Sequence, residues 1–235
     1  MLAPLKEYDF SKYPMICAHR GDTSLGAPEN SCEAIEAALM SGAEMVEVDI
    51  QFTTAGDIVC HHDEISGGGR YERFEDIVAL ATGKIYLNIE LKGYGVVDEL
   101  PLVPKLFELI ERYHMNDRVL YSSFRPDYIT ELSKEHSTTI IHPTTEMSSF
   151  IGIEAIDQWL PSELLMKTSA ASYAAQLSEL DEWRMSDILS NKIHLSVYTI
   201  NTREEFEQAI KFGAKAIVTD RPRDLVQFRK EHFKI

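Results

Sequence analysis

Four short blocks of the sequence carry residue types that could cleave a charged substrate. They are His19-Arg20-Gly21, Glu47-Val48-Asp49, His61-His62-Asp63 and Glu90-Leu91-Lys92. Two imidazoles can act as base and acid on a reacting oxygen. Carboxylates without cysteine or paired histidine ligands favour a hard ion, Mg²⁺ or Ca²⁺, over zinc. The metal and two cations would hold phosphate oxygens. This set suits cleavage of a phosphoric ester, although a metal-dependent proton-abstraction enzyme could use similar residues.

Each block comes at the end of an apolar run, as expected for strands that deliver side chains to one edge of a sheet. Met15-Ile16-Cys17-Ala18 precedes His19, and Gly21 frees the backbone for a sharp turn after it. A histidine at a strand end is more often structural than catalytic, so this block gains meaning only from the other three.

The carboxylates of the second block share one side of a strand. Side chains alternate along a strand, so Glu47 and Asp49 point one way while Val46 and Val48 point the other. A solvated edge strand could carry the same pattern. The apolar neighbours instead favour a buried strand, where two adjacent carboxylates need a cation or shifted pKa values. Glu90 begins a similar pair, with Lys92 on the same face.

The third block leaves a choice between two histidines. The run Asp57-Ile58-Val59-Cys60-His61 precedes it, and alternation places His62 on the side of Ile58 and Cys60. Register is loose at a strand exit, so alternation alone does not decide between His61 and His62. Asp63 can fix the tautomer of a neighbouring imidazole.

Strand-like and helix-like segments alternate along most of the chain, which predicts an α/β fold with a parallel sheet, closed or open. The predicted strands are 15–18, 44–50, 57–61, 85–91, 118–123, 193–199 and 215–219. The predicted helices are 30–41, 98–115, 126–136, 202–212 and 222–233. Between 137 and 192 the pattern weakens: 139–142 could be a strand, and 150–160 and 180–190 could be helices.

Bulk properties narrow the class of protein. The 235 residues suit one domain, 1–235, near the roughly 250 residues of a (β/α)₈ barrel. A formal charge of −15 argues against nucleic-acid or anionic-membrane partners. No apolar stretch approaches the roughly 18 residues of an integral membrane segment. The start does not resemble a secretory signal, and three cysteines favour reduced thiols and a cytoplasmic location, with Cys17 and Cys60 in the core.

The four blocks, taken in order, resemble the glycerophosphodiester phosphodiesterases. Pro28-Glu29-Asn30-Ser31 behind the first block adds to the likeness, as do 197–201 and 213–222 near the end of the chain. The resemblance covers about residues 15 to 222. It implies a (β/α)₈ TIM barrel of the phospholipase C-like phosphodiesterase type, with the site at the carboxyl ends of the strands.

The resemblance also implies an activity and roles for residues. The activity is metal-dependent hydrolysis of glycerophosphodiesters, which are small-molecule phosphodiesters, to sn-glycerol 3-phosphate and an alcohol. By position, the acid-base pair would be His19 and His62, the Mg²⁺ or Ca²⁺ ligands Glu47, Asp49 and Glu90, and the phosphate-binding groups Arg20 and Lys92. Tyr198 would form an aromatic wall of the substrate pocket, where a tryptophan is common in the family. The resemblance leaves open whether the protein forms a homo-oligomer.

The segment between the third and fourth blocks is shorter than in the family, and this difference allows other functions. Only 27 residues separate His62 from Glu90, and Ser66-Gly67-Gly68-Gly69 is typical of a tight loop. The family's small inserted subdomain is therefore expected to be largely absent and the site more open. A lysophospholipase D-like activity or another phosphodiesterase activity is one alternative, because a shallow site admits a bulkier substrate. A catalytically silent binding protein on the same barrel is the other.

Overall fold

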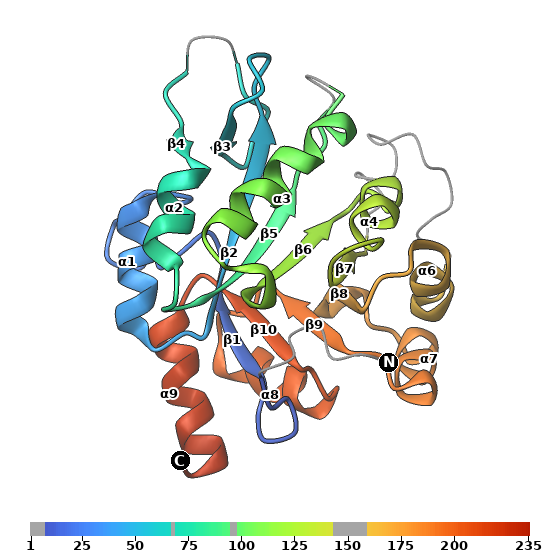
Figure 1. Ribbon diagram of the computed structural model, residues 1–235. Coiled ribbons are helices and arrows are strands. Elements are labelled where there is room, and N and C mark those ends of the chain that lie inside the picture. Colours follow the sequence, from blue (N-terminus) through green and yellow to red (C-terminus); the bar gives the residue numbers. More distant parts are fainter. Residues whose placement is uncertain (1–7, 67–68, 95–97, 143–158) are drawn as a thin grey trace.

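Eight parallel strands close into a barrel, which decides between the closed and open sheets that the sequence allows. The computed structural model describes residues 8–66, 69–94, 98–142 and 159–235. The barrel strands are β1 (Met15–Ala18), β2 (Met45–Phe52), β5 (Tyr86–Leu91), β6 (Val119–Ser123), β7 (Thr138–Ile141), β8 (Ser172–Gln176), β9 (Leu195–Tyr198) and β10 (Ala216–Thr219). Each strand pairs in parallel with the next, and β1 closes the ring by pairing with both β2 and β10 (Figure 1).

A short antiparallel extension stands on β2, outside the ring. It consists of β3 (Ile58–Cys60) and β4 (Glu72–Arg73). The predicted strand 57–61 therefore forms, but it runs back along β2 instead of continuing the parallel sheet, with Cys60 opposite Ile50. This reversal returns the chain to the end of the barrel, where the amide of His61 donates to the carbonyl of Asp49 at 3.2 Å.

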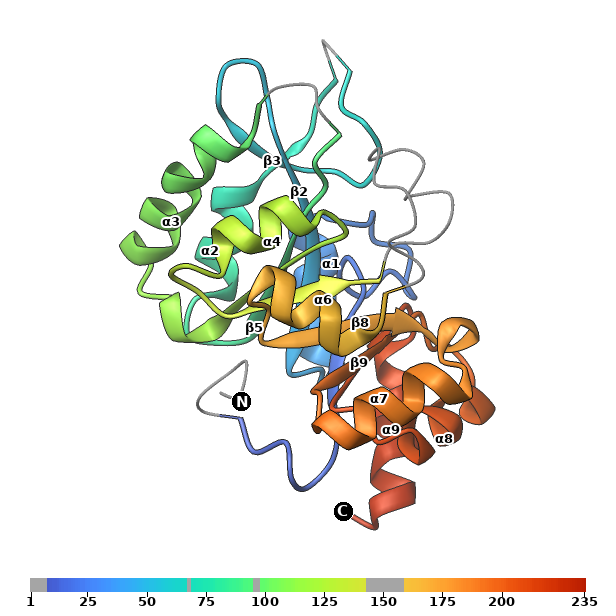
Figure 2. The ribbon, with the colours of Figure 1, turned by 90° about the vertical axis from the view of Figure 1, so that its right-hand side faces the viewer.

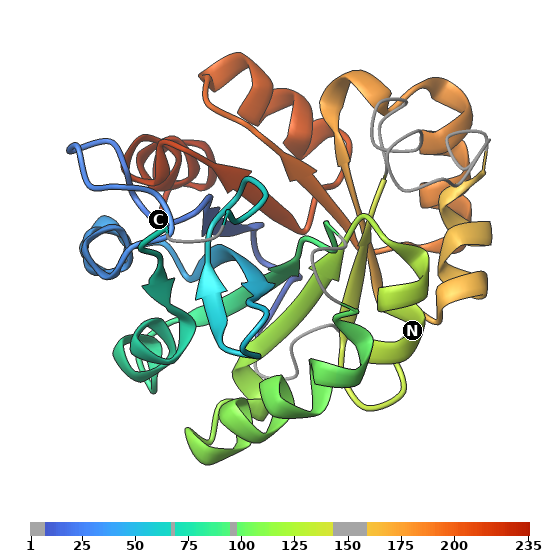
Figure 3. The same ribbon diagram turned by 90° about the horizontal axis from the view of Figure 1, so that it is seen from above.

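The helices lie outside the ring of strands (Figure 3). They are α1 (Cys32–Ser41), α2 (Phe74–Ala81), α3 (Val103–Arg112), α4 (Pro126–Leu132), α6 (Pro161–Thr168), α7 (Glu182–Asn191), α8 (Arg203–Lys211) and α9 (Pro222–Phe233). Short 3₁₀ turns are η1 (Leu100–Leu102), η2 (Asn116–Arg118) and η4 (Leu177–Glu179). The α6 helix packs on the outer side of β7 and β8 (Figure 2).

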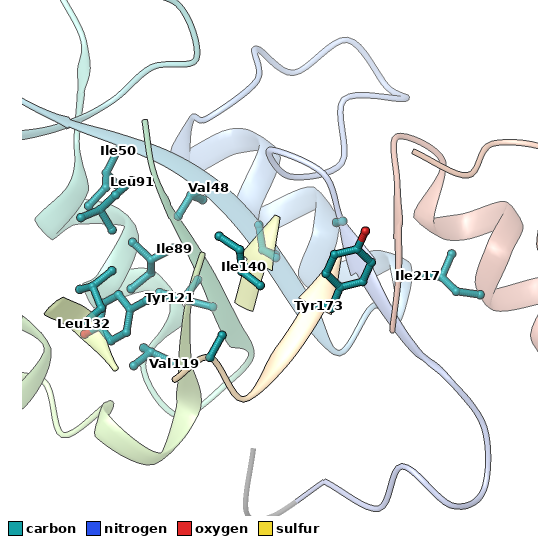
Figure 4. Close-up of a cluster of buried hydrophobic side chains, with 14 of the residues drawn as sticks. Val48, Ile50, Ile89, Leu91, Val119, Tyr121, Leu132, Ile140, Tyr173 and Ile217 are labelled. Atoms are coloured by element: carbon teal, nitrogen blue, oxygen red, sulfur yellow. The ribbon is translucent and has the colours of Figure 1, made fainter. Parts of the chain in front are cut away.

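The main hydrophobic core lies between the strands and the helices. Alternation sends Val46 and Val48 to this outer side, where both are fully buried, as the sequence predicts. Figure 4 shows the same layer continuing through Ile89, Tyr121 and Ile140 on the next strands. The inner side of the same strands is therefore left for polar groups.

Two of the elements that were not predicted, β8 and α6, lie in the weak stretch of the sequence pattern, between 137 and 192, whereas α2 lies before it. Strand β7 confirms the predicted strand near 139–142, and α7 confirms the helix near 180–190. Strand β8 was missed because Ser172-Tyr173-Ala174-Ala175-Gln176 lacks β-branched residues. Helices α2 and α6 were missed as well. The helix predicted at 150–160 lies outside the described residues, apart from its last two positions.

Two predictions about the chain as a whole can be compared with the structure. Across the described ranges, no helix is both long enough and apolar enough to span a membrane. All three cysteines carry free thiols, and Cys17 and Cys60 are buried in the core as predicted.

Candidate functional site

The His-Arg-Gly block forms a tight left-handed turn at the end of β1. Arg20 and Gly21 both have positive φ, 55° and 93°. A Cβ on Gly21 would lie 2.5 Å from that of Ala34 in α1, so only glycine fits at this point. The turn aims the amide of Arg20 into the barrel, where it donates to Glu47 Oε2 at 3.0 Å. The backbone itself therefore helps to orient the first carboxylate.

Three buried carboxylates meet inside the carboxyl end of the barrel. Glu47 and Asp49 come from β2, and Glu90 lies opposite Asp49 in the register of β5. One ligand oxygen of each lies within 4.8 Å of the others. Glu47 Oε1 is buried without a hydrogen-bond partner among the described residues. This all-oxygen donor set with an unused ligand atom fits a divalent cation.

The charges of this cluster are unequal. Burial and the neighbouring Asp49 and Glu90 raise the pKa of Glu47 well above its usual value. Burial also opposes ionisation of Asp49, but Lys92 and Arg20 outweigh it and lower the pKa of that carboxyl. Ionisation is therefore less favoured at Glu47 than at Asp49, and a bound cation beside Glu47 would stabilise its carboxylate form.

Lys92 and Arg20 reach the cluster from opposite sides. Lys92 Nζ lies 2.6 Å from Glu90 Oε1 and 3.2 Å from Asp49 Oδ1. Burial acts against the ammonium ion, but these two carboxylates more than compensate and raise the pKa of Lys92. Arg20 Nε lies 3.1 Å from Asp49 Oδ2, and its Nη1 donates to Glu29 Oε2 at 3.0 Å. Both cations are thus held in fixed places beside the carboxylates.

His19 is held by a carboxylate that the sequence analysis did not single out. Its Nδ1 lies 2.7 Å from Asp220 Oδ1, just after β10. The hydrogen bond to His19 is the main cause that lowers the pKa of Asp220. An ionised carboxylate only accepts, so Nδ1 carries the proton and Nε2, 4.0 Å from Glu47 Oε2, is free to exchange one. Asn201 Nδ2 donates to the other oxygen of Asp220 at 2.8 Å.

His62 has the same arrangement. Its Nδ1 lies 2.8 Å from Asp63 Oδ1, which leaves Nε2 free. His62 lines the cavity that holds the carboxylates, whereas the ring of His61 stacks at 4.9 Å against Tyr71. The structure therefore places His62, and not His61, at the site.

A single cavity of about 270 Å³ joins these groups. Seven of the eight predicted site residues line it, namely His19, Arg20, Glu47, His62, Glu90, Lys92 and Tyr198. The eighth, Asp49, does not line the cavity but contacts both Lys92 and Arg20. The Tyr198 ring meets Phe124 edge-on at 6.4 Å, so the aromatic wall has two members. Phe124 directly follows β6. The search for side chains at the ends of predicted strands, extended to the strand predicted at 118–123, would have identified it.

Asp220→Asn is expected to lower kcat about tenfold or more. The decrease should be smaller than that caused by removing the imidazole of His19. The amide no longer supports a cationic His19. We therefore expect the pH–rate profile to shift while KM changes little, which a purely structural role would not produce. Asp224→Asn, which removes a carboxylate paired with Arg221, is the matched control.

The same substitution should also change how stability depends on pH. The pKa of Asp220 is lower in the folded protein than its ordinary 3.8. Its contacts therefore stabilise the fold above that value and are lost as the pH falls through the folded pKa. Urea unfolding should show a gap in the free energy of unfolding between wild type and Asp220→Asn at about pH 6, and this gap should narrow as the pH falls below 3.8. A gap independent of pH would contradict this.

Known proteins share both the sequence pattern and the fold. The model of the Glycerophosphoryl diester phosphodiesterase family matches residues 19–68 and 65–224. A Glycerophosphodiester phosphodiesterase of Caldanaerobacter subterraneus is 25% identical over 244 residues, covering 90% of this chain and 96% of that protein. One of Bacillus altitudinis is 26% identical over 255 residues, covering 92% and 98%.

Solved structures agree on the barrel. A putative glycerophosphoryl diester phosphodiesterase from Silicibacter pomeroyi superposes with a TM-score of 0.81 at 17% identity, covering 94% of this chain and 95% of that one. An Oleispira antarctica phosphodiesterase in complex with the product sn-glycerol-3-phosphate superposes with a TM-score of 0.76 at 19% identity, covering 92% and 96%. The chain therefore belongs to the glycerophosphoryl diester phosphodiesterase family and is an enzyme of that phosphodiesterase class.

Proposed function

We propose that this protein hydrolyses glycerophosphodiesters to sn-glycerol 3-phosphate and an alcohol, with a divalent metal ion and two histidines. One observation carries the proposal. His19 and His62, each held through Nδ1 by a carboxylate, line the same cavity as a three-carboxylate cluster and two fixed cations. The family match and the product named for the Oleispira antarctica relative support the substrate class.

The two imidazoles divide the proton transfers of the reaction. One Nε2 takes the proton from the attacking hydroxyl as its oxygen bonds to phosphorus. The other Nε2 gives a proton to the alcohol oxygen as its bond to phosphorus breaks, so that a neutral alcohol leaves. Asp220 and Asp63 keep both rings in the tautomer that this requires.

The charged groups stabilise the phosphoryl oxygens. Glu47, Asp49 and Glu90 would hold Mg²⁺ or Ca²⁺, which when bound polarises the phosphoryl group as a Lewis acid. Lys92 and Arg20 present their cations at the same cavity and bind the non-bridging oxygens. Because their positions are fixed by Asp49, little reorganisation is needed as charge builds.

The surroundings of the site fit a small-molecule substrate. Tyr198 and Phe124 form an apolar wall beside Lys92, whose Nζ lies 5.9 Å from the Phe124 ring centroid. The free thiols of all three cysteines agree with a reducing compartment such as the cytoplasm.

A coupled assay for sn-glycerol 3-phosphate tests the proposal. Glycerophosphocholine, glycerophosphoethanolamine and glycerophosphoinositol are each supplied with Mg²⁺, Ca²⁺ or EDTA. We expect release from at least one diester with one of the ions and none with EDTA. If no diester released sn-glycerol 3-phosphate with either ion, the proposed substrate class would be rejected. Full activity in EDTA would reject the proposed dependence on a metal ion.

A further inference from the structure

The inside of this barrel is hollow below the carboxylates. The cavity that holds the site continues down to Phe10, Met15 and Lys215 at the opposite end of the barrel. Its volume of about 270 Å³ equals that of roughly nine water molecules at about 30 Å³ each. A (β/α)₈ barrel is usually filled by layers of bulky branched side chains. The space therefore needs an explanation in the side chains of this chain.

Small residues on one half of the barrel leave this space. Leu120, Ile141 and Val218 are branched inward-facing residues on β6, β7 and β10, but several other inward-facing positions on β6 to β10 carry short side chains. They are Ser122, Thr139, Ser172, Ala174, Ser196 and Ala216. These strands are consecutive, so the hollow runs along one continuous wall opposite Glu47.

Burial values support the hollow independently of its volume. Val197 and Ile217 face the helices and are 0% exposed, and Figure 4 shows Ile217 in that outer layer. Their neighbours Ser196 and Ala216 face inward and are only half-buried, and they lie near the starts of β9 and β10, toward the amino end of the barrel. Val218 on the same inner wall keeps 9% of its surface accessible. The accessible surface inside the barrel is therefore concentrated at Ser196 and Ala216. The hydroxyl residues elsewhere on the same wall are at most 3% exposed, namely Ser122, Thr139 and Ser172.

The chemistry of the wall changes with depth. Next to the carboxylates, Asn88 Oδ1 and Ser122 Oγ are buried and have no hydrogen-bond partner among the described residues. Below them the wall becomes apolar. Its members there are Met15, Cys17, Met45, Leu120 and Val218, which form one cluster.

The floor of the hollow is closed by the segment before β1. The Phe10 ring packs edge-on against His194 at 5.7 Å and against Tyr8 at 4.8 Å. Lys215 also lines this end. The floor therefore limits how far an apolar group can extend from the site.

We propose that the hollow takes an unbranched hydrocarbon chain carried by the diester, and this inference rests on the function proposed above. The phosphate would stay between His19 and His62, the oxygen that joins the chain would meet Asn88 and Ser122, and the methylenes would fill the apolar part. The volume of about 270 Å³ includes the space beside the catalytic groups, so it sets an upper limit of roughly nine methylenes, since a methylene needs about the space of a water molecule. We therefore expect the best chain to be shorter than this limit, with roughly six to eight carbons. The chain could be the alcohol itself or an acyl group on the glycerol.

A chain-length series tests the inference. One arm uses alkyl esters of sn-glycerol 3-phosphate with methyl, butyl, hexyl, octyl and dodecyl groups. The other uses diesters of choline with acyl chains of the same lengths on the glycerol. We expect kcat/KM to rise by up to roughly fourfold for each added methylene in one arm, and to fall beyond about eight carbons. The arm that rises identifies where the chain is attached.

Filling the hollow should remove this dependence. Ser196→Leu places a branched side chain in this wall, and Ala216→Val is a smaller change if the first variant fails to fold. Ser186→Leu, on the exposed face of α7, is the matched control and should keep the wild-type series. Calorimetric titration with octyl phosphate gives a second readout without turnover, and we expect at least tenfold weaker binding to Ser196→Leu than to Ser186→Leu.

The outcomes separate the two proposals. Two results would overturn the hydrocarbon pocket and leave the proposed function standing. One is turnover of glycerophosphocholine with a kcat/KM that does not depend on chain length in either arm. The other is a chain-length dependence that Ser196→Leu leaves unchanged. Absence of turnover for every diester overturns the proposed function. Tight octyl phosphate binding that Ser196→Leu does not weaken also overturns the pocket.

Discussion

Replacing His19 or His62 by alanine is expected to lower kcat by roughly 10²- to 10⁴-fold, the usual contribution of general acid-base catalysis. Each imidazole has its Nδ1 held by a carboxylate, so Nε2 is the atom that exchanges a proton with the substrate. Neither residue belongs to the hydrophobic core, and the fold should survive both changes. Steady-state kinetics on glycerophosphocholine, with far-ultraviolet circular dichroism as a check of folding, measures the effect.

His61→Ala is the matched control for this experiment. His61 is adjacent in the sequence to His62 and equally polar, but its ring contacts Tyr71 and does not line the cavity. We expect it to keep nearly wild-type kcat. If His62→Ala and His61→Ala had the same small effect, the role of His62 would be structural.

Removal of the divalent ion should have an effect of similar size. EDTA is expected to lower activity at least about 100-fold, since a Lewis-acid metal supplies several kcal/mol to charge stabilisation. Glu47→Gln should weaken the apparent metal affinity by more than the roughly 10- to 100-fold lost when an outer-shell partner is mutated. Glu47 Oε1 is a buried oxygen without a hydrogen-bond partner among the described residues, whereas Oε2 accepts from the amide of Arg20. Glutamine can keep that hydrogen bond through its own oxygen, so the substitution removes a ligand and not a structural contact.

Thermal unfolding provides a measurement of the metal that does not depend on activity. An ion at 100 times its Kd should add about 2.7 kcal/mol to the free energy of unfolding of the wild type. Glu47→Gln should lose most of this gain, while Glu207→Gln, an exposed residue of α8, should keep it. Equal stabilisation of both variants would remove Glu47 from the ligand set.

Local patterns in the sequence are enough to predict the positions of the site residues. Alternation places Glu47 and Asp49 on one side of β2 and the valines on the other, because a strand allows only two faces. The same rule puts Lys92, directly after β5, on the side of Glu90, the last but one residue of that strand. These inferences need no knowledge of which strands are neighbours.

Long-range partners could not be predicted in the same way. Asp220 lies 201 residues after His19, and the two meet only because β10 closes the barrel onto β1. His62 reaches the site because β3 turns back along β2, whereas the sequence pattern suggested one more parallel strand. Both contacts depend on strand order, which residue spacing along the chain does not encode.

The sequence by itself determined the chemical inventory of this protein: two histidines, three carboxylates and two cations, in or just after its strands. Only the tertiary structure decided which atoms meet. It placed His62 in the cavity, as the family resemblance implies, and His61 outside it, supplied Asp220 as the partner that orients His19, and left the barrel interior hollow. The physical reason is that inward-facing side chains from eight strands share one volume, so what fits there depends on all of them together.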